Sequence, residues 1–194
     1  MFSQRSLFHV LHSFSLRCEQ CGYVQGMGPI AATLLCYFGP EKVYAALTRL
    51  HDAYAMHVIF SPGFPGLLES IYVQERIMEL KMPDVHAAFK KHMISTTSYA
   101  TKWYITLFAN SVPFQTQLRL WDAFLLDGQD VFVAVAVAIV WTYRGNVCPL
   151  AKITKISRRA MQIKSRRARP TLRPCYRCCR LSLFQRTKTS FCLG

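Results

Sequence analysis

Residues 22–38 read GYVQGMGPIAATLLCYF, which joins a glycine-flanked corner to a strongly apolar segment. From Met27 to Phe38 the apolar side chains recur at intervals of three and four residues, the spacing of one helix face. A Gly-Pro pair follows directly and predicts the end of that helix. Gln25 therefore stands in a tight turn at a helix start, and from the residues alone the segment is simply a turn.

Helical spacing covers most of the first 144 residues and predicts an all-α fold built from many helices. Further helices are predicted up to Ser15, over 43–54 and 67–80, after Pro83, and after Pro113, where Phe114, Leu118, Trp121 and Leu125 share one face. Residues 131–138 alternate branched and small side chains, as a strand does. Their context favours a buried helix instead.

Charge is distributed unevenly along the chain, which has 24 Lys and Arg, 10 Asp and Glu, and a formal net charge of +14. Residues 1–144 carry 11 of the basic residues and all the acidic ones, so that this part is almost neutral. Residues 145–194 carry the other 13 basic residues and no acidic one, and helical periodicity also stops there. We expect a globular domain at 1–144 and a basic, disordered tail at 145–194.

The basic tail fits several roles. A run of Lys and Arg binds the phosphates of an anionic membrane or of nucleic acid, and a merely solvated tail has the same composition. We expect contact with an anionic membrane surface rather than with nucleic acid.

The sequence lacks the patterns of membrane-spanning and secreted proteins. The longest apolar run, 131–141, is about half of the ~20 residues that a membrane-spanning helix needs. Arg5 and Arg17 interrupt any secretion-signal pattern at the N-terminus. Eight cysteines without regular spacing do not indicate a disulfide framework. The sequence predicts a cytoplasmic protein with reduced thiols.

Motifs for independent catalysis are missing. There is no Gly-rich loop ending in Gly-Lys-Ser/Thr, no His-Glu-x-x-His and no Gly-x-Ser-x-Gly, which argues against an NTPase and a hydrolase. Cys18-x-x-Cys21 and Cys175-x-x-Cys178 could supply four zinc ligands, but more than 150 residues separate the pairs, against about 12 to 20 in local zinc motifs. The six histidines are scattered along the sequence. We expect separate thiols and no metal.

Two separated stretches carry a more specific pattern. Residues 23–26, Tyr-Val-Gln-Gly, resemble the Tyr-x-Gln-Gly motif of the TBC domain, the catalytic domain of Rab GTPase-activating proteins. Residues 118–128 resemble that family's Leu-Arg-x-Trp-Asp-x-x-Leu-x-x-Gly pattern. Between them, Trp103, Leu107, Phe108 and Pro113 fall where the family has a tryptophan, a Leu-Phe pair and a proline.

The resemblance implies a helical domain that accelerates GTP hydrolysis on a Rab. Gln25 corresponds to the glutamine that orients the attacking water in place of the GTPase's own glutamine, and Tyr23 and Gly26 belong to its Rab-binding motif. An amide offers a donor and an acceptor, which suits that role. No cofactor is implied for this chain, because GTP and Mg²⁺ belong to the partner GTPase. The resemblance also implies a cytoplasmic protein that lies at the periphery of endomembranes.

The remaining motif residues are expected to be structural. Trp103, Trp121 and Phe114 are assigned to core packing, and Arg119 and Asp122, three residues apart, to an ion pair beside Trp121. Gly128 closes the helix that precedes it.

A second family motif, Ile-x-x-Asp-x-x-Arg, is absent from the sequence. Because an arginine finger contributes roughly 10³ to 10⁵ in rate, we expect impaired activation. The family pattern also continues with helices beyond Trp141, so a fragment, a splice variant or a misread frame is one hypothesis. The alternatives are a non-catalytic Rab-binding or scaffold protein of vesicle trafficking, and a nucleic-acid or membrane binder acting through the tail.

Overall fold

The computed structural model describes residues 4–144, and the regular structure of that range consists of α-helices. Their bounds are α1 Gln4–Ser15, α2 Met27–Leu35, α3 Pro40–Ala53, α4 Met56–Phe60, α5 Pro65–Lys81, α6 Pro83–Lys91, α7 Thr96–Ile105, α8 Phe114–Asp127 and α9 Asp130–Tyr143. The all-α prediction is confirmed for this range. The predicted tail at 145–194 and the roles assigned to it lie outside the described residues.

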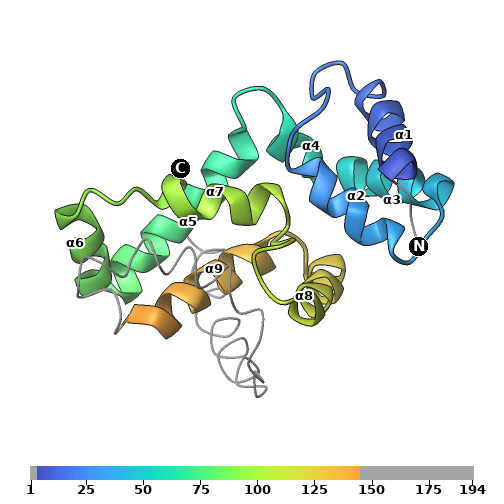
Figure 1. The fold of residues 1–194 in the computed structure, drawn as a ribbon. Coiled ribbons are helices and arrows are strands. Elements are labelled where there is room, and N and C mark those ends of the chain that lie inside the picture. Colours follow the sequence, from blue (N-terminus) through green and yellow to red (C-terminus); the bar gives the residue numbers. More distant parts are fainter. Residues whose placement is uncertain (1–3, 145–194) are drawn as a thin grey trace.

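The helices form an elongated assembly with α1 to α4 at one end and α5, α6, α7 and α9 at the other (Figure 1). At the first end α1 packs against α2 and α3. At the other end α5 packs against α6, α7 and α9, while α8 packs against α9. One large apolar core runs through both groups, and a smaller cluster around Met78 and Val140 closes the α6 end.

The segment that alternates like a strand belongs to a buried helix, as the context predicted. Residues 131–138 lie in α9, where Phe132 and Ala136 are almost completely covered. A helix enclosed by neighbours on most sides does not need a polar face, and this explains the continuous run of apolar residues.

The predicted inner face of α8 is wrong by about one position. Phe114 and Leu125, both expected inside, are 43% and 48% exposed. The face that packs inward carries Gln117, Leu120 and Phe124 instead, together with Trp121. A search for apolar positions passes over Gln117 because its side chain is polar. Its amide can nevertheless be buried, since it donates a hydrogen bond to the Thr33 hydroxyl at 2.9 Å.

Phe114 is therefore a surface residue and not part of the core. Its ring stacks on Tyr37, with 6.4 Å between the ring centroids and an interplanar angle of 3°. By contrast, Trp103 and Trp121 are buried, as the sequence predicted. Of the described helices, none is long and apolar enough to cross a membrane.

Candidate functional site: the glutamine loop

The loop between α1 and α2, residues 16–26, is held at its beginning by two turns. After α1 ends, the Arg17 backbone N–H donates to Phe14 O at 3.1 Å. The Gly22 N–H then donates to Cys18 O at 2.9 Å, and Gly22 has a φ of +54°, which favours glycine. The chain is thereby reversed so that residues 23–26 lead directly into α2.

An ion pair ties this loop to α3. The Arg17 guanidinium makes two hydrogen bonds to the Asp52 carboxylate, at 3.1 Å and 2.7 Å. The hydrogen bond from His51, and after it those from Arg17, hold the pKa of Asp52 below its usual range. Arg17 is thus engaged within its own chain.

Gly26 is buried because the backbone of α7 passes directly over it. A Cβ built on Gly26 would lie 2.7 Å from the Ile105 Cγ1 and closer still to the Ile105 carbonyl oxygen. Real Cβ atoms essentially never come within 3.0 Å of such atoms. Close backbone contact, rather than an unusual φ, requires glycine at this position, and it fixes the start of α2 against the end of α7.

Gln25 points to solvent from the end of this fixed corner. The Gln25 side chain is exposed, and its amide has no hydrogen-bond partner among residues 4–144. Tyr23 is also exposed, at 56%, and its hydroxyl reaches back toward Gly28 in α2. No side chain caps the N-terminus of α2, which begins two residues after Gln25. The Met27 N–H donates to Val24 O at 2.9 Å, and Pro29, the third residue of the helix, has no N–H.

The second predicted motif supports the first through the segment after α7. The Trp121 indole N–H donates to Leu107 O at 2.9 Å. Leu107 follows closely on Ile105, whose backbone covers Gly26. The tryptophan of residues 118–128 therefore stabilises the segment on which the glutamine loop rests, and the two motifs are linked although they are distant in sequence.

The remaining predicted motif residues lie on α8 and at its C-terminal end. Arg119 and Asp122 form an ion pair at 3.4 Å on the outer face of α8, with side chains 86% and 64% exposed. Gly128 ends α8 with φ +84° and ψ −169°, a conformation essentially limited to glycine.

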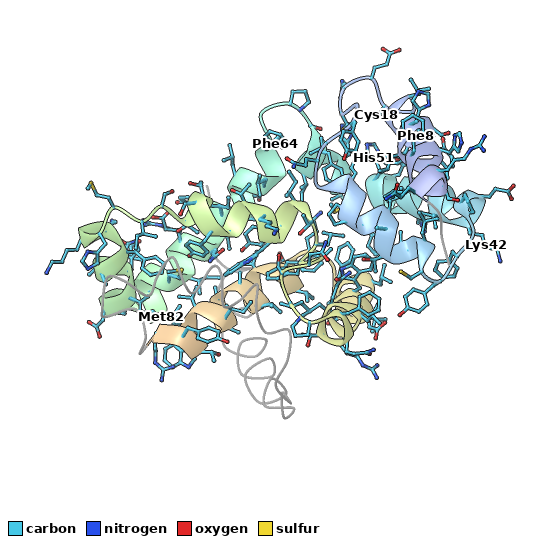
Figure 2. The ribbon with its side chains drawn as sticks, viewed as in Figure 1. Phe8, Cys18, Lys42, His51, Phe64 and Met82 are labelled. Atoms are coloured by element: carbon cyan, nitrogen blue, oxygen red, sulfur yellow. The ribbon has the colours of Figure 1, made fainter. Side chains whose placement is uncertain are left out.

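A cluster that the sequence analysis missed lies at the base of the same loop. Cys18 and Cys21 from the loop meet His51 of α3 and His57 of α4, and their ligand-type atoms all lie within 4.8 Å of one another. Figure 2 shows Cys18 and His51 next to each other at the α1–α4 end. The only partners considered for these thiols from the sequence, Cys175 and Cys178, lie outside the described residues.

Hydrogen bonding and burial affect the two thiols in opposite directions. The Cys21 backbone N–H, pointing at the Cys18 sulfur, lowers the pKa of the Cys18 thiol. Burial raises the pKa of the Cys21 thiol.

Comparisons with known proteins point to one family. The family model of the Rab-GTPase-TBC domain matches residues 3–147. A TBC domain-containing protein of Schizosaccharomyces pombe is 40% identical over 126 residues, which is 64% of this chain and 30% of that protein. The GTPase-activating protein GYP5 of Saccharomyces cerevisiae is 35% identical over 136 residues, covering 70% of this chain and 15% of GYP5.

Solved structures agree on the fold. The Chlamydomonas flagellar RabGAP TBC domain superposes with a TM-score of 0.69 at 23% identity, over 83% of this chain and 54% of that domain. The chain thus spans about half of this solved domain, and less than a third of either curated relative. Because the family model matches most of the length of this chain, the chain belongs to the Rab-GTPase-TBC domain family.

Proposed function

We propose that this chain binds a GTP-loaded Rab-family GTPase and supplies Gln25 in trans to promote hydrolysis of the GTP. The observation that carries the proposal is the exposed Gln25 amide, which has no hydrogen-bond partner among residues 4–144 and stands on a corner fixed by Gly26. A neutral amide can accept a hydrogen bond from the attacking water and donate another to the GTPase backbone. In doing so it would hold the water in line with the γ-phosphate.

The start of α2 adds a favourable field at this position. The helix dipole gives the N-terminus of a helix a partial positive charge. The negative charge of a triphosphate is stabilised near such an end. Gln25 stands two residues before Met27, the first residue of α2, so that water positioning and charge stabilisation would act at the same point of contact.

The rate enhancement by the polypeptide of residues 1–194 is proposed to be reduced. None of its arginines stands in an Ile-x-x-Asp-x-x-Arg motif, and Arg17 is paired with Asp52. An arginine finger contributes roughly 10³ to 10⁵ in rate. The missing motif also favours the second candidate, a Rab-binding or scaffold protein of vesicle trafficking that does not accelerate hydrolysis.

Single-turnover GTP hydrolysis on a panel of purified Rabs separates the two candidates. The chain is compared with Gln25→Ala and with Gln20→Ala, which removes another exposed amide from the same loop. We expect acceleration on at least one Rab that Gln25→Ala abolishes and Gln20→Ala retains. Binding without any acceleration would support the scaffold instead.

The proposed site of action is the cytoplasmic face of endomembranes, where the basic residues 145–194 would contact anionic lipid. Co-sedimentation with vesicles containing phosphatidylserine tests this contact. We expect binding that falls steeply with added salt, because counterion release drives such contacts. Equal binding to neutral vesicles would contradict it.

A further inference from the structure

The side chains of Cys18, Cys21, His51 and His57 form a set of ligands that the glutamine mechanism does not use. Two thiols and two imidazoles from separate parts of the chain converge on one point. They come from the loop, from α3 and from α4, so the fold and not a local sequence motif brings them together.

Most of the spacings among these atoms fit a tetrahedral metal, and all of the atoms lie within 4.8 Å of one another. Cys21 Sγ lies 3.6 Å from His51 Nε2 and 3.4 Å from His57 Nδ1, and Cys18 Sγ lies 3.8 Å from His57 Nδ1. The two ring nitrogens are 3.0 Å apart. Ideal bonds of about 2.3 Å to sulfur and about 2.05 Å to nitrogen place tetrahedral ligands about 3.6 Å apart for S···N and about 3.3 Å apart for N···N.

The outer contacts orient His51 for this role. Asp52 Oδ1 lies 2.7 Å from His51 Nδ1, and Asp52 is in turn held by Arg17. A carboxylate that accepts a hydrogen bond from Nδ1–H keeps the proton on Nδ1 and leaves a lone pair on Nε2, the nitrogen that faces the Cys21 thiol. Carboxylates support histidine ligands of zinc in this way.

Burial also suits a structural ion. His51 is 6% exposed and packs edge-on against the Phe14 ring, and both thiols are half-buried. Two thiolates would neutralise the charge of a divalent cation, whereas a buried cation without anionic ligands is costly.

We propose that Cys18, Cys21, His51 and His57 bind one Zn²⁺, which clips the glutamine loop to α3 and α4. The proposal replaces the sequence-based expectation of no metal. Gln25 comes only four positions after Cys21, so the ion would restrict the corner that presents the amide. Metal binding itself does not depend on the proposed activity toward a Rab.

The first test measures the metal in the full chain without any substitution. The chain, purified under reducing conditions and dialysed, is analysed for metals by mass spectrometry, and X-ray absorption at the zinc edge identifies the ligands. We expect one zinc per chain with two sulfur ligands at about 2.3 Å and two nitrogen ligands at about 2.0–2.1 Å. A chain that contains no zinc and binds none on titration, or a shell of four sulfurs, would overturn the proposal.

The second test assigns the ligands by Co²⁺ substitution, whose visible absorption reports tetrahedral thiolate coordination. We expect Cys21→Ser and His57→Asn to lose that absorption. Cys36→Ser and His12→Asn, which change exposed residues outside the cluster, should retain it. The double variant Cys175→Ser/Cys178→Ser should also retain the Co²⁺ absorption. The assignment would be refuted if the double variant lost this absorption while His57→Asn kept it.

The third measurement connects the ion to the loop. Hydrogen exchange of residues 18–26 is compared in the wild-type chain before and after zinc removal by a chelator. We expect exchange in these residues to accelerate on removal, while exchange in the α5–α9 pair is unchanged. Identical exchange in the two states would contradict the clip.

Discussion

Replacement of Gly26 by alanine tests the contact that positions the glutamine loop. The new Cβ would lie 2.7 Å from Ile105 Cγ1, 2.8 Å from the Ile105 carbonyl carbon and closer still to the carbonyl oxygen. Because the obstacle includes backbone, a change of rotamer cannot relieve it, and the start of α2 must move away from the end of α7. Overpacking of this kind costs about 1–3 kcal/mol.

That cost is measurable by thermal unfolding. For a domain of this size, each kcal/mol lowers the Tm by roughly 2–4 °C. We therefore expect Gly26→Ala to lower the Tm by roughly 2–12 °C and, because the displaced backbone carries Gln25, to reduce any acceleration of GTP hydrolysis as well.

Gly28→Ala is the matched control, two residues further along the chain and inside α2. A Cβ on Gly28 would meet only the Tyr23 hydroxyl at 3.5 Å, an ordinary contact. Alanine in a helix is favoured over glycine by roughly 0.5–1 kcal/mol, so this variant should be as stable as the wild type or slightly more stable. Equal Tm values for the two variants would refute the close-contact argument.

Three further substitutions test the packing around the site, each followed by thermal or urea unfolding. Tyr104→Phe removes the hydroxyl that donates to Oε1 of the fully buried Gln74 at 2.7 Å, and an unsatisfied buried oxygen should cost about 1–3 kcal/mol; no loss of stability would contradict this. Gly128→Ala introduces a side chain at a φ of +84° and should also cost about 1–3 kcal/mol, whereas an unchanged Tm would show that the turn relaxes. Arg119→Ala breaks only the exposed pair with Asp122 and should change stability by less than about 1 kcal/mol, so a larger loss would mean that the pair has a further role.

Sequence reasoning reached the helical fold because most helices have an apolar stripe at regular spacing. It failed where a polar residue lies inside that stripe. Gln117 is buried through its bond to Thr33, a contact 84 residues away in sequence that no local pattern contains. For this reason the prediction placed Phe114 and Leu125 on the buried face of α8, although both are exposed.

The glutamine motif could be located from the sequence, but the physical need for its second glycine could not. Only glycine fits at position 26, because any Cβ there would clash with the backbone of Ile105. Ile105 is far from Gly26 in sequence, so this contact is seen only in the fold. The role of Trp121 is similar, since its partner is the carbonyl of Leu107.

The cluster of thiols and imidazoles shows the same limit. Cys18 and Cys21 give a recognisable pair, yet His51 and His57 lie on α3 and α4 without a typical ligand spacing. The short helix α4, Met56–Phe60, was not predicted, because five residues are too few to show a periodic pattern. Its start after Ala55, at a φ of +56°, turns His57 toward the loop.

The most direct test of the central claim uses a Rab whose own water-positioning glutamine has been changed to alanine. If Gln25 supplies that function in trans, the chain should accelerate single-turnover GTP hydrolysis on this Rab about as much as on the unmodified one. Gln25→Ala should abolish the acceleration on both Rabs. Acceleration that disappears with the Rab glutamine but survives in Gln25→Ala would contradict the account.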